Sequence, residues 1–386
     1  MVINAVLDNY LEKQQSPTSA FMTSNRVMVN SSDMFLERVW ISVVATFALA
    51  AITWGQTPTL PKIEPKLLQA DLQIARKALE EGHSGMYRYT PKPELDRAFD
   101  SANKKLTQPM DALEFLRVLA PVVADIKCGH TSVRPPKQIS EAVNQTIALF
   151  PFGVAIVDGK VYVTREYEPN EQKLAGLEIR KINGAEIDSI LATMLAATPG
   201  DADSQTVRPW RVADDFNLDL YDLAGIKSPF TVEFLDSKTG KNRTLQFSGG
   251  PYPDLQKIAE KRYPQDAEPK DSVSLKFIDE NMLMNGGSFS TTCEFLSNLH
   301  DRKRAIFVGE EAGGGYFGNT SGPTVRVTLP NTEVRIIIPL RTYYLAVKDG
   351  IPNRSILPDY EVKQSINDIL SDNDTVMFRA IELARK

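Results

Sequence analysis

The chain has 386 residues, of which 42% are hydrophobic and 24% are charged, and its formal net charge is −5. This length and apolar content support more than one hydrophobic core. Because the Lys and Arg residues are scattered over an acidic chain, the composition argues against a nucleic-acid partner.

An apolar segment near the N-terminus predicts export. A basic residue precedes the run of apolar and small residues 39–55, as in a secretory signal. Residues 34–58 are therefore predicted to be a signal peptide or a signal-anchor, with 39–55 as the membrane anchor if it is not cleaved, and the protein to be periplasmic or extracellular. Residues 1–33 are a polar, unexplained leader, which translation from Met34 would remove. A buried core helix is the alternative interpretation of the apolar run.

The next part of the chain, residues 59–140, is predicted to be a helical N-terminal domain. Apolar residues recur there at helical spacing: Leu68, Leu72, Ala75 and Leu79. In "TQPMDALEFLRVLAPVVADI", Thr107 and Pro109 are typical of a helix start.

Residues 141–250 show strand patterns. "FPFGVAIVDGKVYVTREY" and "SPFTVEFLDSKTGKNRTLQF" predict hairpins, and "LAGLEIRKINGAEIDSILATML" predicts a strand, a turn at Asn183-Gly184 and a helix. From residue 251 to residue 386, strands and helices alternate, with "VSLKFI" and "RAIFVGEE" as strands, a hairpin around "PNT" and a capped C-terminal helix. This alternation is typical of an α/β core.

Ser290 is the candidate nucleophile. It follows the turn "NGGSF" and begins a predicted helix, where it would be exposed beside outward-pointing N–H groups. The same pattern fits an ordinary helix N-cap, with Glu294 in a capping role. Pattern alone leaves both interpretations open.

A serine nucleophile needs a base, and the chain has three histidines. His300 lies among charged residues and is expected to be solvated. His83 follows a helix and fits a cap or a packing residue. His130, in the small-residue turn "CGHTSV", is the candidate base, although a structural histidine bonded to the backbone fits equally.

The two cysteines, Cys128 and Cys293, do not form a disulfide framework. We interpret them as buried thiols. The histidines and cysteines lack metal-ligand spacing, so neither a structural zinc nor another cofactor is predicted.

The motifs "DIKCGHTSV", "NGGSFSTTCEF", "VGEEAGGGYFGNTSG" and "GIPNRSILPDYEV" occur in this order. Together they resemble the C-terminal (tail-specific) processing peptidases, in the tricorn-like branch that uses a serine and a histidine. "LAGLEIRKINGAEI" is similar to the PDZ-like domain of that family. The resemblance covers most of residues 66–386. It implies a mixed α/β fold, with a PDZ-like domain over 141–250 and a crotonase/Clp protease-like core over 251–386.

The resemblance also implies roles for individual residues. Ser290 matches the nucleophile, His130 the general base, and the backbone N–H of Thr291 one oxyanion donor. Asn319 stands near the place of the lysine that the other branch of the family uses. The tricorn-like pattern has an acid before the final "PD" to support the histidine, and in this sequence Asn353 stands in for it.

One departure from the family bears on activity. In the family, a long stretch with a second oxyanion turn precedes the serine motif, whereas here "KFIDEN" runs directly into "MLMNGGSFS". The core is thus predicted to be truncated near 281–282. Losing one oxyanion donor costs ~10²–10³ in rate. Because sheet surface is lost as well, we expect Ser290 and His130 not to be held within hydrogen-bond reach, ~2.6–3.2 Å.

Two functions follow from these patterns. The first is a serine-type peptidase acting on exported or unfolded polypeptides. The second is an inactive relative that binds a peptide C-terminus through its PDZ-like domain. An error in the gene record would also explain the gap. The sequence does not indicate an oligomeric state.

Overall fold

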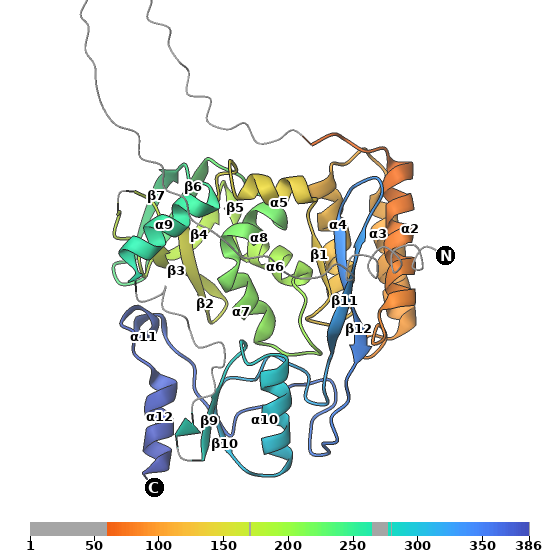
Figure 1. Cartoon of the computed structure of the whole chain (residues 1–386). Coiled ribbons are helices and arrows are strands. Elements are labelled where there is room, and N and C mark those ends of the chain that lie inside the picture. The colour runs from red at the N-terminus through yellow and green to blue at the C-terminus, as the bar shows by residue number, and fades with distance from the viewer. Residues whose placement is uncertain (1–59, 170, 265–276, 279, 386) are drawn as a thin grey trace, which may run out of the picture. The chain divides into compact units, whose positions relative to one another are not determined.

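The computed structural model describes residues 60–169, 171–264, 277–278 and 280–385. The fold is mixed α/β, and its described residues form three sheets (Figure 1). The predicted leader and the signal peptide or anchor lie outside these residues. Within the described chain, no helix is both long and apolar enough to cross a membrane.

The helices and strands follow one another along the chain as mixed blocks. The helices are α2 (Pro65–Gly82), α3 (Lys92–Lys105), α4 (Ala112–Ala124), α5 (Lys137–Val143), α6 (Ile187–Ala197), α7 (Val207–Asp214), α8 (Phe216–Asp222), α9 (Tyr252–Arg262), α10 (Thr291–Asp301), α11 (Ile366–Leu370) and α12 (Thr375–Ala384). The strands are β1 (Ser132–Arg134), β2 (Phe152–Val157), β3 (Lys160–Glu166), β4 (Glu178–Ile182), β5 (Ala185–Glu186), β6 (Phe230–Asp236), β7 (Lys241–Phe247), β8 (Phe277–Ile278), β9 (Asn281–Met284), β10 (Ile306–Gly309), β11 (Thr320–Thr328), β12 (Arg335–Thr342) and β13 (Tyr360–Glu361).

Helix α4 leads directly to the loop that carries His130. Its predicted start at Thr107 and Pro109 is wrong, because the helix begins at Ala112. Asp111 is the N-cap and forms a capping box with Glu114. A capping box satisfies two otherwise unpaired N–H groups at the helix start, so it outweighs the proline signal upstream.

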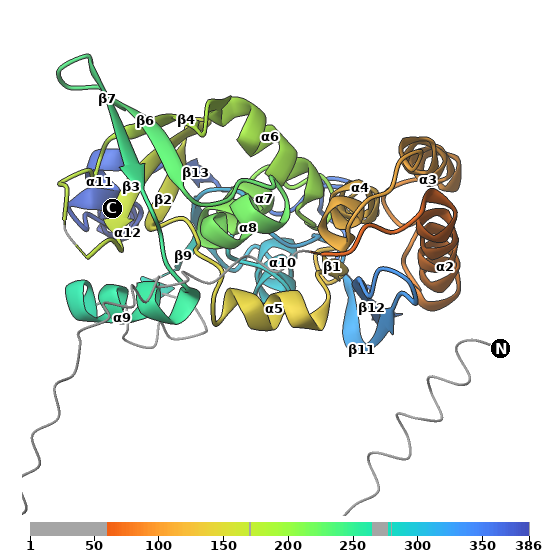
Figure 2. The same cartoon turned by 90° about the horizontal axis from the view of Figure 1, so that it is seen from above.

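The N-terminal helices share one hydrophobic core with the distant hairpin of β11 and β12. Apolar residues of α2, α3 and α4 pack there with Leu329, Val334, Ile336 and Ile338. Figures 1 and 2 both show α2 and α3 beside this hairpin. The buried carboxylate of Asp71 accepts hydrogen bonds from the backbone N–H groups of Asn331 and Thr332 in the hairpin turn. The helices are thereby fixed to the end of the hairpin.

The middle of the chain forms a sheet with strand order β2-β3-β4-β6-β7, with β5 added to β4. The predicted hairpins around "DGK" and "KTGK" are confirmed, as is the strand–turn–helix at Asn183-Gly184. Apolar residues of this sheet pack against α6, α7 and α8. β2 is an edge strand of the described sheet, and α7 packs against it. The PDZ-like assignment and the domain boundaries stay predictions.

The third sheet, β13-β10-β9-β8, carries the serine turn. β9 pairs in parallel with β10, and β10 pairs in parallel with β13. Of the predicted strand "VSLKFI", only Phe277–Ile278 is described, and it forms β8. Met282, Met284 and Phe307 of this sheet pack against Cys293 and Leu296 of α10. The strand before the serine therefore has a partner and a core despite the short connection that precedes it.

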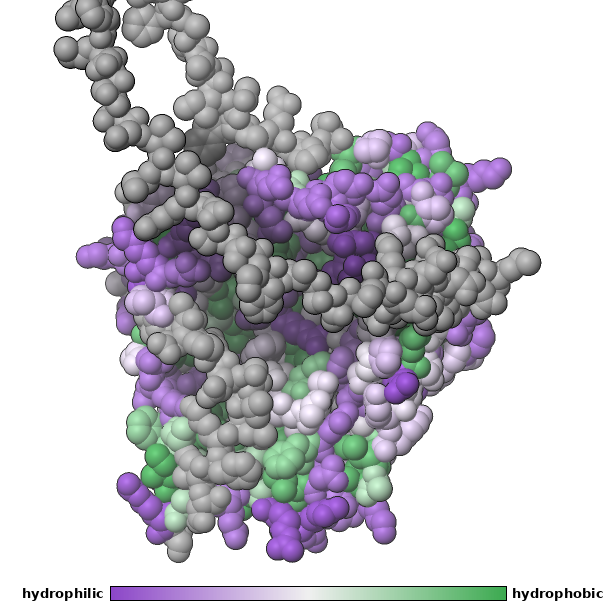
Figure 3. All heavy atoms as spheres, in the orientation of Figure 1, coloured by the Kyte–Doolittle hydropathy of each residue, from purple (hydrophilic) through white to green (hydrophobic). Residues whose placement is uncertain are grey.

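Apolar side chains are also exposed at this end of the chain. Phe295 on α10 is 40% exposed and Phe378 on α12 is 58% exposed. Figure 3 shows hydrophobic side chains at the surface over the region of α10 and α12. Both side chains are thus only partly covered by the described chain.

Candidate active site

Ser290 lies at the end of a tight turn that joins β9 to α10. The turn can pack closely against α7 because it contains two glycines. A Cβ atom on Gly286 would lie 2.5 Å from the carbonyl oxygen of Thr206, and one on Gly287 would lie 2.9 Å from the Trp210 indole. The "NGG" of the sequence motif is therefore a packing requirement that fixes where the serine stands.

The backbone of Ser290 is strained, with φ 55° and ψ −128°. A non-glycine residue in a sparsely populated region of this kind costs ~1–3 kcal/mol and is typical of functional sites. Ser290 occupies the N-cap position of α10, yet its side chain makes no capping hydrogen bond within the described chain. Glu294 instead accepts a hydrogen bond from Asn319 at 2.7 Å. The structure thus disfavours the N-cap interpretation.

His130 reaches Ser290 from the loop between α4 and β1. Its Nε2 atom lies 3.0 Å from Ser290 Oγ. We expected the short connection before β9 to keep these two residues apart, and that expectation is wrong. The parallel pairing of β9 with β10 and the packing under α10 hold the serine turn in place after this short connection.

Phe289 and Arg211 hold the imidazole of His130. The rings of His130 and Phe289 lie 4.7 Å apart between centroids, and the Arg211 guanidinium lies 4.5 Å from the Phe289 centroid. Arg211 also donates to the carbonyl oxygens of Gly129 and Pro199, at 2.9 and 2.8 Å. A Cβ atom on Gly129 would lie 2.6 Å from the Phe289 ring. Sequence patterns gave no signal for either Phe289 or Arg211.

The environment of His130 favours its neutral form. Burial of the ring, together with the positive charge of Arg211, lowers the pKa of His130 to about 4. At neutral pH the imidazole is therefore uncharged. A neutral imidazole can accept a proton from the Ser290 hydroxyl, which a general base must do.

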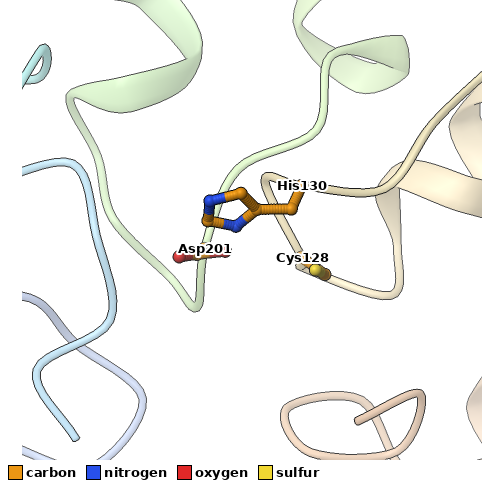
Figure 4. Close-up of side chains that lie close together, drawn as sticks. All are labelled: Cys128, His130 and Asp201. Carbon is orange, nitrogen blue, oxygen red and sulfur yellow. The ribbon is translucent and has the colours of Figure 1, made fainter. Parts of the chain in front are cut away.

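Asp201 is a site residue that the sequence did not predict. It lies in the loop between α6 and α7, is 1% exposed, and its Oδ1 accepts a hydrogen bond from the N–H of Gly129 at 2.6 Å. Burial raises the pKa of Asp201 to about 6, although the Gly129 N–H and the charge of Arg211 act in the opposite direction. Figure 4 shows Asp201 beside the His130 ring.

One nitrogen of His130, one carboxylate oxygen of Asp201 and the sulfur of Cys128 lie within 4.8 Å of one another. His130 Nδ1 and Asp201 Oδ2 are buried, and neither has a hydrogen-bond partner among the described residues. Cys128 and Cys293 are free and buried, which confirms the interpretation of buried thiols.

Asn353 does not take the supporting role that the resemblance implies. Its side chain is exposed, and its carbonyl oxygen accepts a hydrogen bond from the N–H of Asp203 at 2.9 Å. Because His130 Nδ1 has no hydrogen-bond partner in the described chain, the expected contact with Asn353 is not formed. Asp201, not Asn353, is the polar side chain beside the ring.

The other two histidines are held within the structure. His83 is buried, and its Nε2 atom lies 2.8 Å from Thr131 Oγ1. His300 is half-buried, and its Nδ1 atom lies 3.0 Å from the Tyr316 hydroxyl. The expectation that His300 is solvated is therefore wrong.

The N–H of Thr291 and the glycine-rich loop border Ser290. Thr291 is the first residue of α10, where N–H groups lack an intrahelical acceptor. In the glycine-rich loop, Gly313 donates its N–H to the carbonyl oxygen of Ser288 at 3.0 Å. A Cβ atom on Gly314 would lie 3.3 Å from the nitrogen of Ser290. The loop therefore forms one wall beside the serine.

A cleft of about 1040 Å³ lies beside this site. It is lined by Gly153–Ile156 of β2, by Thr206 and Trp210 at the start of α7, and by Glu311 and Arg354. Ser290 and His130 are not among its lining residues. Thr206 and Trp210 connect the cleft with the Ser290–His130 site, because they also contact the glycines of the serine turn.

No protein-family model and no curated protein sequence matches the chain. The fold, however, is similar to that of CPAF, a chlamydial serine protease. Mature CPAF matches with a TM-score of 0.53 and 13% identity, over 83% of this chain and 97% of that chain. Mature CPAF complexed with lactacystin matches with a TM-score of 0.54 and 12% identity, over 83% of this chain and 98% of that chain. At this identity the likeness concerns the fold.

Proposed function

We propose that this chain is a serine peptidase that cleaves polypeptides by acyl transfer. The observation that carries the proposal is the 3.0 Å approach of His130 Nε2 to Ser290 Oγ, made by a strained serine that does not cap its helix. A nucleophile and a base within hydrogen-bond reach are the signature of covalent catalysis. The fold shared with CPAF supports the same reaction class.

In the proposed reaction, Ser290 is the nucleophile and His130 transfers the protons. As Ser290 Oγ bonds to the carbonyl carbon of the substrate, its proton passes to His130 Nε2. The C–N bond then breaks, and the imidazolium returns the proton to the leaving amine. A water molecule then attacks the acyl-enzyme in the same way, with His130 again as the base. This step releases the carboxylic acid product and restores Ser290. The N–H of Thr291 stabilises the negative oxygen of each tetrahedral intermediate.

Asp201 is assigned here as the positioning residue for the base. When Nε2 accepts the serine proton, Nδ1 must carry the other ring proton. An acceptor beside Nδ1 selects that tautomer and stabilises the imidazolium, as the carboxylate of a catalytic triad does. The unpartnered oxygen of Asp201 is the carboxylate oxygen available for this role.

The cleft beside the site offers a place for an extended polypeptide. β2 is an edge strand of its described sheet, and its residues line the cleft. An extended peptide can add to such an edge through backbone hydrogen bonds. The assignment of this sheet to a PDZ-like module, membership of the tail-specific family, a truncated core and export all belong to this proposal.

A peptide-binding module without catalysis is the second candidate. It is favoured by one observation, that the lining of the large cleft includes neither Ser290 nor His130. In that case the cleft would bind a peptide C-terminus that is not cleaved. The two candidates differ in turnover and not in binding.

The deciding experiment compares wild type with Ser290→Ala on an unfolded protein substrate, with cleavage products identified by mass spectrometry. We expect cleavage by wild type and a loss of at least 10³-fold in the variant. Thr292→Ala, two residues further along the chain and within α10, is the matched control and should retain activity. Unchanged cleavage by Ser290→Ala would refute the peptidase, and tight peptide binding without cleavage by wild type would support the binding module.

Covalent labelling gives a second test that needs no substrate. A fluorophosphonate probe should modify Ser290 in wild type and leave Ser290→Ala unmodified. Lactacystin, the ligand of one CPAF structure, is a further probe to apply in the same way. Absence of any adduct on wild type would count against an activated serine.

A further inference from the structure

The side chains of Cys128, His130 and Asp201 form a compact group of three different ligand types. A ring nitrogen, a thiol sulfur and a carboxylate oxygen lie within 4.8 Å of one another. Figure 4 shows Cys128 and Asp201 on one side of the His130 ring. We propose that these three residues bind a zinc ion, and that the bound ion inactivates the catalytic pair. The inactivation rests on the proposed function, whereas the binding does not.

Unsatisfied atoms at the centre of the group point to a ligand. His130 Nδ1 and Asp201 Oδ2 are both buried without a close hydrogen-bond partner among the described residues, and the N–H of Gly315 is the nearest further donor to the carboxylate. The sulfur of Cys128 lies 3.3 Å from the carbonyl oxygen of Thr320, and the Thr131 hydroxyl and the N–H groups of His130 and Thr131 also interact with it. Buried polar atoms are normally satisfied, so two of them facing one small space need an explanation. A metal ion would satisfy both at once.

The donor set selects the class of metal. A thiolate, an imidazole and a carboxylate match zinc, whereas magnesium and calcium prefer oxygen ligands alone. Around a tetrahedral zinc, ligand atoms lie roughly 3.3–3.6 Å apart, so side-chain shifts of about 1 Å would bring the group to that geometry. Three protein ligands would leave the fourth position to water.

Neighbouring groups orient the ligands and balance their charge. The N–H of Gly129 holds Asp201 Oδ1 at 2.6 Å, which leaves Oδ2 for the metal. A thiolate and a carboxylate together supply two negative charges for the dication. Arg211 opposes binding by its positive charge, but its guanidinium is held by the carbonyl oxygens of Gly129 and Pro199. Because Cys128 must lose its proton, zinc binding releases a proton to solvent.

Zinc on Nδ1 would switch off the base without touching the serine. A neutral imidazole that coordinates metal through Nδ1 carries its proton on Nε2. That nitrogen then cannot accept the proton of Ser290. The same ion occupies the oxygen of Asp201 that would otherwise support the imidazolium. One bound cation thus prevents His130 from acting as the base and prevents Asp201 from supporting the imidazolium.

The experiment uses the full chain after treatment with a chelator. Cobalt(II) replaces zinc as a spectroscopic probe, since a cobalt–thiolate bond gives a near-ultraviolet absorption band, and zinc affinity is measured by calorimetry. Wild type should bind one ion and show the band. Cys128→Ser should lose the band and bind zinc at least tenfold more weakly, and Asp201→Asn should also bind more weakly. Cys293→Ser, which alters the other buried thiol, is the matched control and should behave as wild type.

Peptidase activity is then followed in buffered zinc. We expect zinc to abolish hydrolysis by wild type and a chelator to restore it, while Cys128→Ser keeps its basal activity and resists zinc. Equal inhibition of wild type and Cys128→Ser, or an unchanged cobalt spectrum in Cys128→Ser, would overturn the proposed site. If wild type hydrolyses nothing at any zinc concentration, the peptidase proposal fails, and the binding data still decide the metal site.

Discussion

Arg354 donates two parallel hydrogen bonds to Glu311, at 2.9 and 3.0 Å, and so joins the late "PNRS" segment to the glycine-rich loop beside the serine. Glu311 is 6% exposed, and it also accepts from the N–H of Gln205 at 3.0 Å. Three segments near the candidate active site therefore meet at one carboxylate.

Removing the cation from this pair should destabilise the fold. Arg354→Ala leaves the Glu311 charge buried, and a broken buried pair typically costs about 3–5 kcal/mol. Because the Arg354 side chain is 33% exposed, we expect a loss at or below the lower end of that range, about 2–3 kcal/mol. Chemical denaturation measures it. Arg354→Lys keeps the charge but cannot make two parallel hydrogen bonds, so its free energy of unfolding should lie between those of wild type and Arg354→Ala. Equal stability of Arg354→Ala and wild type would contradict this account.

Asp201→Asn should slow catalysis and leave the fold intact. The amide can still accept from the Gly129 N–H, but it cannot stabilise an imidazolium. Loss of a directly bonded triad carboxylate costs ~10⁴ in kcat. Here the carboxylate oxygen lies up to 4.8 Å from the ring nitrogen, so we expect a smaller loss, on the order of 10–10². The loss should appear in kcat with KM unchanged. A change in KM alone would assign Asp201 a purely structural role.

Gly129→Ala should impair the site through the Phe289 ring. The added methyl group would lie 2.6 Å from that ring, which packs on His130. We expect His130 to move and the rate of serine labelling by a fluorophosphonate to fall at least tenfold, since misplacement by about 1 Å can cost ~10² in rate.

Gly82→Ala is the control for that variant. Its added methyl group would meet Ile338 at 3.5 Å, an ordinary contact, so labelling should be unchanged. Labelling that is equally fast in Gly129→Ala would show that the Phe289 contact does not hold the base.

Asp219 on α8 should make stability depend on pH. Burial, with the nearby charges of Asp215 and Asp222, raises the pKa of Asp219 to about 8 from an ordinary value of 3.8. Between pH 4 and 8, the unfolded chain loses this proton while the folded chain keeps it. The free energy of unfolding must therefore fall as the pH rises across that window and level off above pH 8.

Asp219→Asn cannot ionise, so it should lose part of this pH dependence. Denaturation at pH 5 and pH 8 gives the comparison, and the variant should gain stability relative to wild type at pH 8. Asp214→Asn, at an exposed position on the preceding helix, is the control. If Asp219→Asn and wild type lose equal stability between the two pH values, Asp219 is ionised in the folded state.

Local patterns predicted the turns of this fold well. The hairpins around "DGK", "KTGK" and "PNT" and the helix after the serine all form, because each depends on a few neighbouring residues. The resemblance paired Ser290 with His130, and the structure brings the two side chains together although the short connection before β9 was expected to separate them. It failed at Asn353, since the acid beside the ring belongs to a different loop.

Features that depend on distant contacts were not predictable in this way. Asp201 lies 72 residues from the Gly129 N–H that holds it, and no motif marks it. The residues of the proposed zinc site likewise come from two loops, so their spacing has no metal signature. The effect of the short connection before β9 was misjudged, because the sequence does not show that β9 pairs with β10 and packs under α10.

The contact between Asp71 and the hairpin turn spans 260 residues. At about 5–20 residues per second of synthesis, α2 leaves the ribosome roughly 10–50 s before its partner exists. During that interval its apolar face can pack against α3 and α4 but lacks the hairpin side of their shared core. Ser290 and His130 are also brought together late. They lie 160 residues apart in the sequence, so the pair on which the proposed peptidase depends forms only after both segments have been translated.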